Sequence, residues 1–546
     1  MSGDFRIKII GVGQNPRGRT YVQIAAARGD GERKPIGLFV LEEVAQNPNV
    51  LPSAATTAGI PLVTNSVKSR FLREVQAALD RIEDLPSRCD FEVADQCGWH
   101  GDNFVTPYRV YGEKADALRT ALTVSRPDRW TPAGTLEEWQ EMVGPIGSHS
   151  ELAVFAVCAA FAAPLLSLLG RDGVGFALVG KNSTAKTTLS VLAGSVWGGA
   201  SDGGAGESWY ATVNALEPMA AQFRHFLLVL DDIQRLPGGE KQRAEALHNA
   251  IFMLPSGGEK HRLTAAGPLK SWDLIYLATN NQTTRQMMEA GNRTYDPSME
   301  VRLAQIPTDR PYGVFDTIPA GISPADYSDQ IRERASLIYG SPIDAYLKRL
   351  TYHVGRSKEE LVGWLKRRIK SQTERMGIDR ARGSEARIAA AFALVYAAGR
   401  LARSYDILPW RSALIRDAIL GTYRSHRQVL ATETPQRDPV QRVRDFIRAN
   451  RDQFIDLRKT SVTRKQLESY PGAVMDSRGY GREFAFTAAQ FARNIGASNG
   501  VAAVVAALKS ARLLHSDGDK SQTKRDLGDG ERVRVYAIAA SILDER

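Results

Sequence analysis

The sequence predicts an α/β fold with a buried parallel sheet at its centre and smaller domains on either side. Two apolar runs, 175–179 and 226–230, have the length and composition of buried strands. The first leads directly into the segment 180–187, GKNSTAKT, and the second ends in Asp231 and Asp232. Because parallel strands present their carboxyl ends at one edge of a sheet, we expect these polar residues to lie near one another.

The segment 180–187 has the composition of a phosphate-binding loop. Successive backbone N–H groups and a helix N-terminus meet the charge of a triphosphate, Lys186 adds a point charge, and Thr187 offers Mg²⁺ a hydroxyl. Ala185 stands where the usual G-x-x-x-x-G-K-[ST] pattern has glycine. We therefore predict a magnesium–ATP site formed by Gly180, Lys181, Asn182, Ser183, Thr184, Ala185, Lys186, Thr187 and Thr188.

The residues that follow supply candidates for hydrolysis. Asp231 is placed to hold Mg²⁺ and Asp232 to orient or deprotonate the attacking water. Asn280 closes a third apolar run, 274–280, and is suited to hold the γ-phosphate or the water, and Arg302 comes after it. Singly, each has an ordinary alternative as a solvated strand end, a turn residue or a surface charge. Together and in this order they favour a ring-forming AAA+ type ATPase, in which Arg302 reaches into the neighbouring subunit's site.

Length and composition fit a large protein of ordinary globular type. The chain has 546 residues, 43% hydrophobic and 24% charged, which predicts about three or four domains. A net charge of +10 favours an anionic partner such as nucleic acid. Three cysteines, Cys89, Cys97 and Cys158, have no metal-binding spacing, so a reducing, cytoplasmic setting is expected.

One segment, 152–170, is uncharged and long enough to cross a bilayer. Pro164 lies within it, however, and the proposed phosphate loop follows within about ten residues. We predict a buried helix behind the ATPase core and no membrane association.

The composition of the remaining chain predicts five parts. The first three are an N-terminal α/β domain at 1–125, a linker at 126–150 and the ATPase core at 151–315. A helical lid at 316–435 and a winged helix at 436–546 follow. The N-terminal domain is defined by strand-like runs at 5–10, 20–24 and 36–40 and by a helical stretch at 67–82. Gly11-Val-Gly13 is interpreted as a turn. The lid is defined by helical stretches at 358–370 and 385–404.

The last part has the pattern of three helices followed by a hairpin. Helices are expected at 442–454, 487–494 and 501–514, and a strand at 532–538. Basic residues on the third helix and the hairpin suit phosphate and groove contacts on DNA, although a protein-binding winged helix is the open alternative. The candidate contacts are Lys509, Arg512, Lys520, Lys524 and Arg525.

The chain also resembles DUF927, a family of phage and mobile-element proteins described as superfamily II helicases or their inactivated derivatives. The resemblance rests on GWHGDNFVTP at 98–107 and on STAKTT at 183–188 with VWG at 196–198. It also rests on EVRLAQIP at 300–307 and on AAGRLA at 397–402 with ILPW at 407–410. Related self-loading helicases, similar to minichromosome maintenance proteins, imply a hexameric ring on single-stranded DNA.

The same resemblance suggests further site residues. Minichromosome maintenance proteins carry Ala-Lys-Ser at the place of Ala185, and their lid helix opens with a nucleotide-sensing arginine that corresponds to Arg387. A hairpin before the third strand points into the pore of such rings, which here implies Lys260, His261 and Arg262, beside two glycines, Gly257 and Gly258, that permit a tight turn.

We therefore expect an ATP-dependent DNA helicase or translocase of a mobile genetic element, acting as a homo-oligomeric ring on single-stranded or forked DNA. A DNA-bound ATPase switch or loader that does not unwind is the alternative. An inactivated derivative that only binds nucleic acid is the third.

Overall fold

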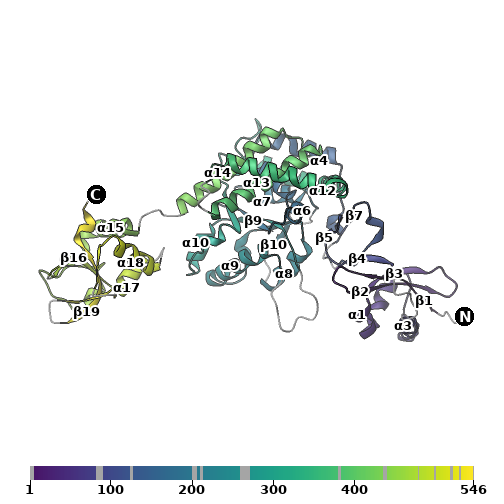
Figure 1. The fold of residues 1–546 in the computed structure, drawn as a ribbon, viewed down its shortest axis with the longest axis horizontal. Helices are drawn as coiled ribbons and strands as arrows, with labels where there is room; N and C mark the ends of the chain where they lie inside the picture. Colours follow the sequence, from purple (N-terminus) through teal and green to yellow (C-terminus); the bar gives the residue numbers. More distant parts are fainter. Residues whose placement is uncertain are drawn as a thin grey trace. The chain divides into compact units, whose positions relative to one another are not determined.

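The computed structural model describes residues 5–81, 90–122, 124, 127–199, 206–209, 213–258, 271–378, 383–433, 439–477, 479–496, 500–516, 520–527 and 531–544. The chain separates into two units, Met1–Val429 and Leu430–Arg546 (Figure 1). The finer division into five parts stays a prediction.

A five-stranded parallel sheet forms the centre of the first unit. Its order is β10-β11-β12-β9-β13, so β12 separates the strand before the loop from the strand that ends in the acids. Nearly every side chain in β9, β11 and β12 is buried, as expected for a parallel sheet covered on both faces. The strands span β9 Val174–Val179, β10 Gly206–Ser208, β11 Leu227–Asp231, β12 Ile275–Asn280 and β13 Leu303–Pro307. The three strands predicted from apolar runs are confirmed.

Helices cover both faces of this sheet (Figure 1). One layer contains α5 (Glu151–Ala160), α7 (Lys186–Gly194) and α13 (Gly383–Ser404), which pack on one another. The other contains α8 (Val213–Gln222) and α9 (Glu240–Ser256). The loop before α7 therefore lies at the carboxyl edge of the sheet.

The apolar segment at 152–170 forms two helices rather than one. Helix α5 ends at Ala160, α6 spans Ala163–Leu169, and the two are bent by 57°. No single helix among the described residues is long and apolar enough to cross a membrane, although this bent pair passes by length and composition. All described side chains from Leu152 to Leu166 are buried in the main core.

A helical bundle completes the first unit. It contains α11 (Pro324–Leu337), α12 (Ser341–Arg375), α13 and α14 (Ser412–Glu433), and both helical stretches predicted for the lid lie within it. Residues assigned to a linker include α4 (Leu136–Ile146), which begins with a capping box at Thr135. Buried Trp139, Met142 and Val143 fix α4 in the core, so this segment is structured.

The N-terminal part forms a second sheet, with order β3-β2-β1-β4-β8. The strands span β1 Phe5–Gln14, β2 Thr20–Arg28, β3 Lys34–Val40, β4 Phe91–Ala94 and β8 Leu118–Thr120, with α1 Leu41–Gln46, α2 Leu51–Thr57 and α3 Asn65–Leu79 beside them. Interpreting Gly11-Val-Gly13 as a turn was wrong. Both glycines lie in β1, where the Phe91 ring occupies the space that a Cβ would need, at 2.6 Å for Gly11 and 2.3 Å for Gly13.

A small sheet joins this part to the core. It consists of β5 (Gly98–His100), β6 (Asn103–Val105) and β7 (Val110–Tyr111). Trp99 is buried, and its indole Nε1 donates to the carbonyl of Pro164 at 2.8 Å. Its backbone N–H donates to Nδ1 of His225 at 3.0 Å. The GWHGDNFVTP motif therefore anchors this sheet to the core.

The second unit is a sheet with apolar clusters on both faces. The strand order is β14-β15-β16-β19-β17, with β18 also paired to β19. Its strands are β14 Ile455–Asp456, β15 Ala473–Ser477, β16 Gly481–Thr487, β17 Leu514–His515, β18 Thr523–Asp526 and β19 Arg532–Ala539; its helices are α15 Pro439–Ala449, α16 Arg464–Leu467, α17 Ala488–Phe491 and α18 Gly500–Ser510. One apolar cluster is packed against α15, α17 and α18 and the other against α16. The three predicted helices and the last strand are present. The hairpin of β15 and β16 was not predicted.

Candidate functional site

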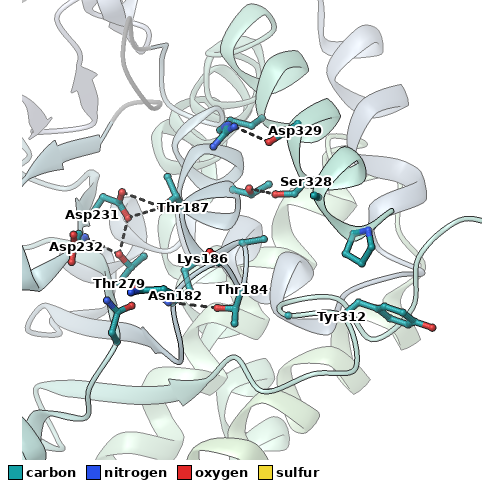
Figure 2. A pocket seen from close by; sticks show the side chains of 18 of the residues that line it. Asn182, Thr184, Lys186, Thr187, Asp231, Asp232, Thr279, Tyr312, Ser328 and Asp329 are labelled. Carbon is teal, nitrogen blue, oxygen red and sulfur yellow. Dashed lines mark hydrogen bonds and ion pairs between the residues drawn. The ribbon is translucent and has the colours of Figure 1, made fainter. Parts of the chain in front are cut away.

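A cavity of about 790 Å³ opens at the carboxyl edge of the central sheet (Figure 2). The loop before α7 lines one side, the ends of β11 and β12 line another, and the start of α11 faces them. The sequence brings together there seven of the predicted ATP residues and both acids: Asn182, Ser183, Thr184, Ala185, Lys186, Thr187, Thr188, Asp231 and Asp232. Gly180 and Lys181 belong to the same loop but do not line the cavity.

The loop has a backbone that favours small residues. Ser183 and Ala185 have φ of 61° and 65°, in the left-handed region, where a side chain carries a steric cost. This explains why glycine is usual at the position of Ala185. At Gly180 any Cβ would lie 2.1 Å from Oγ1 of Thr308, so this glycine is required by close packing.

Lys186 is 8% exposed and begins helix α7. Its ammonium donates to the loop carbonyls of Gly180 at 2.8 Å and Lys181 at 2.6 Å. Burial lowers the pKa of Lys186, while the carboxylates of Asp232 and Asp231 act in the opposite direction. The charge is therefore held within the loop, next to the N-terminus of α7.

Asp231 is at the centre of a hydrogen-bond network (Figure 2). Its carboxylate accepts from Oγ1 of Thr187 at 3.2 Å and from Oγ1 of Thr279 at 2.7 Å. The Thr279 hydroxyl in turn accepts from the backbone N–H of Asp232 at 2.7 Å. The hydroxyl of Thr187 and the carboxylate of Asp231 thus form a pair of oxygen ligands suited to a hard divalent cation.

Asp232 has a left-handed backbone, with φ of 57°. Its carboxylate accepts from the N–H of Gln234 at 3.2 Å and lies 3.6 Å from Nε of Arg235. Arg235 lines the cavity as well. The predicted base is therefore beside the cavity, with its charge balanced by a neighbouring arginine.

Asn280 does not face the cavity, which corrects its predicted role. Successive side chains of a strand point to opposite faces, and Thr279 and Asn281 are the residues of this segment that line the cavity. Asn280 is 3% exposed, its amide donates to Sδ of Met287 at 2.9 Å, and its oxygen accepts from the N–H of Asn281. The sequence located the right segment but the wrong residues within it.

Helix α11 supplies a wall that sequence reasoning missed. Ser328 and Thr188 join through their hydroxyls at 2.5 Å, and Asp329 and Arg332 line the same cavity. Arg332 pairs with Asp329 at 2.7 Å. Of the two arginines, Arg332 lines this cavity and Arg387 does not. The signal available in the sequence was the Ser-Pro start of a helix at Ser323.

Arg302 and Arg387 line a different cavity, of about 430 Å³, together with Arg171. Gly173 and Val174 at the start of β9 also line it, so it lies at the amino edge of the sheet, opposite the loop. Arg302 donates to the carbonyl of Ser298 at 2.9 Å and lies 4.6 Å from the Phe252 ring centroid. Neither Arg302 nor Arg387 can serve the loop of its own chain from this edge.

The predicted nucleic-acid contacts divide into three groups. Lys260, His261 and Arg262 lie outside the described residues. Lys509, Arg512, Lys520 and Lys524 are exposed on the second unit. Arg525 differs, because its guanidinium donates two hydrogen bonds of 2.9 Å to the fully buried carboxylate of Glu483. Its charge is therefore used within the fold.

Comparison with known proteins finds a matching family model and matching solved structures. The family model "Domain of unknown function (DUF927)" matches residues 63–273. The solved structure of "SCCmec type IV Cch - active helicase" matches with a TM-score of 0.64 at 17% identity, covering 98% of this chain and 94% of that one. No curated protein matches by sequence. The chain therefore has a mixed α/β fold similar to that of a helicase structure over nearly its whole length.

Proposed function

We propose that this protein is an ATP-dependent DNA helicase or translocase of a mobile genetic element, with an AAA+ type core and a C-terminal winged helix. The observation that carries the proposal is the cavity at the carboxyl edge of the sheet. It combines in one place a loop in which Ser183 and Ala185 have left-handed backbone angles, the buried Lys186, and the Thr187–Asp231 pair. The match to a helicase structure over most of the chain adds support.

The residues of the cavity fit magnesium–ATP. The loop N–H groups, the N-terminus of α7 and Lys186 are suited to phosphates, and Mg²⁺ usually takes one or two protein oxygens and completes its shell with phosphate and water. The order of the strands also fits, because β12 places Thr279 and Asn281 between the loop and the acids. When bound, magnesium–ATP supplies a transferable phosphoryl group.

The side chains then have separate tasks. Lys186 exchanges its loop carbonyls for phosphate oxygens and stabilises charge there. Thr187 and Asp231 would hold the cation, and Thr279 fixes the carboxylate of Asp231 and the backbone of Asp232. Asp232 accepts the proton of the attacking water once Arg235 and the Gln234 N–H release it.

The position of Arg302 supports a ring. A head-to-tail ring brings the amino edge of one core against the carboxyl edge of the next, so Arg302 would meet the neighbour's phosphates. The exposed basic residues of the second unit and the net charge of +10 support DNA as the substrate.

The second candidate is an ATPase switch or loader that does not unwind DNA. The contacts of Asp232 with the Gln234 N–H and with Arg235 favour this second function. A carboxylate that already has partners is a poorer proton acceptor, so ATP hydrolysis would be slow. Strand displacement that requires ATP separates the two functions.

The first test is the ATPase rate with and without single-stranded DNA. Lys186→Ala and Asp231→Ala should each lower the rate roughly a hundredfold or more, because a positioned charge at phosphoryl transfer is worth about 3–4 kcal/mol. Lys241→Ala, an exposed lysine on α9, is the matched control and should retain the wild-type rate. A Lys186→Ala protein with the wild-type rate would refute the nucleotide assignment.

A further inference from the structure

The turn between β6 and β7 and the first half of α12 form a surface of tyrosines and cations. We define this tyrosine–arginine patch as Tyr108, Arg109, Lys348, Tyr352 and Arg356. Tyr108 is 42% and Tyr352 is 51% exposed, unusual values for large aromatic side chains. The ATPase cavity uses none of these residues, and the turn directly follows the GWHGDNFVTP motif.

Each tyrosine carries an arginine on its ring. The guanidinium of Arg356 lies 4.5 Å from the centroid of Tyr352, and that of Arg109 lies 5.4 Å from the centroid of Tyr108. Such cation–π pairs hold both partners in a defined orientation. The rings are therefore arranged in advance, although half of their surface is open to solvent.

The patch borders a cavity of about 350 Å³. Its lining is partly apolar and includes Val110, Gly112 and the buried Thr351, with Arg109, Lys348 and Tyr352 around them. A volume of this size suits one planar ring system of a ligand. A charged rim over a partly apolar floor is what a nucleotide requires for its phosphate and its base.

The framework beneath the patch is rigid. In the turn, the hydroxyl of Thr106 donates to the carbonyl of Arg109 at 2.8 Å and accepts from its N–H at 2.9 Å. Asp344 of α12 accepts from the Tyr111 hydroxyl at 2.9 Å and pairs with Lys348 at 2.6 Å and Arg109 at 3.6 Å. One carboxylate thus ties the turn to the helix and positions both cations.

The patch itself carries three cations, Arg109, Lys348 and Arg356, and no carboxylate. Besides Arg109, the exposed side of α12 carries Lys348, Arg349, Arg356 and Lys358. The acidic groups nearby are Asp344, already engaged by two cations, Glu113, and Asp102, which lies 4.0 Å from Lys358. Asp406 lies 4.0 Å from Arg349, and Glu359 and Glu360 are exposed beyond Lys358 on α12. A partner that is anionic and presents flat rings therefore complements the surface best.

We propose that the tyrosine–arginine patch binds single-stranded DNA, stacking an unpaired base on Tyr352 or Tyr108 and contacting its phosphates with the adjacent cations. The inference rests on the proposed function, in that the chain works on DNA. It adds a contact in the first unit, separate from the basic residues of the C-terminal unit. Stacking on aromatic side chains tolerates any base, so the patch gives affinity without sequence preference.

The experiment measures binding of the full chain to fluorescent oligo-dT by anisotropy, without nucleotide and over a series of salt concentrations. Tyr352→Ala should weaken binding roughly tenfold, and Tyr352→Phe, which keeps the ring, should restore most of it. Arg356→Ala should lower the slope of log affinity against log salt by about 0.7, the value for one phosphate contact on a single strand. On an abasic oligonucleotide of equal length, which offers no base to stack, wild type and Tyr352→Ala should bind with equal affinity.

A second readout identifies direct contact. Oligonucleotides with 5-iododeoxyuridine should photocrosslink to Tyr352 or Tyr108, located by mass spectrometry. Unfolding temperatures of the variants show whether they are folded. If wild type binds DNA and Tyr352→Ala binds equally well without a change in crosslinks, the inference is wrong while the proposed function stands. If wild type binds no DNA, the proposed function itself fails. If the variant alters only self-association, the patch is a protein interface and the proposal is overturned.

Discussion

At the scale of single residues, Thr279 controls the geometry of the acidic pair. Its hydroxyl donates to Asp231 and accepts from the backbone of Asp232, with 2.7 Å for both bonds. Thr279→Val keeps the shape but removes both bonds, which leaves the Asp231 carboxylate free to turn. We expect kcat for ATP to fall about tenfold or more with a small change in KM, because the lost interaction orients groups that act in the transition state.

Steady-state ATPase kinetics check this expectation. Thr279→Ser retains the hydroxyl and should recover most of the rate, whereas a merely space-filling threonine would be replaced better by valine. Equal rates for Thr279→Val and wild type would show that Asp231 is held well enough by Thr187 alone.

The candidate site shows what a sequence pattern can and cannot locate. Lys186, Thr187 and Asp231 were predicted because each has a fixed place within a sequence motif, the phosphate loop or the end of an apolar strand. Asn280 was predicted and Thr279 was not, because the apolar run gives the end of a strand, whereas the face of each residue depends on the exact register. Arg387 was predicted from the family resemblance and Arg332 was not predicted, because only packing decides which helix of the bundle lines the cavity.

At the scale of elements, His225 ties the small sheet of β5 to β7 to the core. Its Nδ1 accepts the N–H of Trp99, which requires a neutral ring at that nitrogen. Burial lowers the pKa of His225 to about 4, although the hydrogen bond with Asp273 acts in the opposite direction. His426, buried between α14 and β13, also has its pKa lowered to about 4 by burial.

These shifts predict acid destabilisation of the first unit. A folded-state pKa below the ordinary 6.5 means that, between about pH 6.5 and about pH 4, the unfolded chain binds a proton that the folded chain excludes. The free energy of unfolding should therefore fall as the pH drops through this window, by up to about 3 kcal/mol for each histidine. Urea unfolding at several pH values, followed by tryptophan fluorescence, measures it.

The matched variant is His225→Asn, whose amide oxygen accepts the Trp99 N–H without titrating. It should lose part of the histidine-linked pH dependence, the remainder coming from His426 and from His100 and His248, whose pKa values burial also lowers. An unchanged pH dependence in this variant would mean that His225 takes up a proton in the folded state.

Elements were predictable where the local pattern is strong. The strands of the central sheet are continuous apolar runs, and the two stretches that form parts of α12 and α13 have helical periodicity. The strand at Gly11 and Gly13 was not predictable, because the Phe91 ring that fills the space above both glycines comes from a distant part of the chain. The hairpin of β15 and β16 was missed because both strands are short and neither is a continuous apolar run; its turn contains Gly479 and Gly481, which have positive φ.

At the scale of the whole molecule, the chain separates at residue 429 into two units. A protein ending at residue 433, the last described residue of α14, should therefore fold and keep its basal ATPase rate. Its DNA affinity should fall, and the remaining affinity should depend less steeply on salt because fewer phosphates are neutralised. Anisotropy at several salt concentrations measures both, and unchanged affinity would point to a protein-binding role for the second unit.

The position of Arg302 makes a prediction about assembly. Because it lies at the amino edge of the sheet and the loop lies at the carboxyl edge, Arg302 can meet a nucleotide only in another subunit. Arg302→Ala should bind ATP nearly as wild type does and hydrolyse it poorly, since the lost contact is made mainly to charge that develops during transfer. Nucleotide binding and turnover are measured separately to test this.

Mixing two inactive variants then tests whether the site is shared. In a ring of Arg302→Ala and Lys186→Ala subunits at equal amounts, an interface is intact when an Arg302→Ala subunit supplies the loop and a Lys186→Ala subunit supplies the arginine. Random assembly gives one half times one half, or about a quarter of the interfaces. The mixture should therefore regain up to about a quarter of the wild-type rate, which neither variant has alone. If mixed oligomers form, as shown by copurification of two tags, and no activity returns, Arg302 acts structurally within its own core, where Ser298 and Phe252 already hold it.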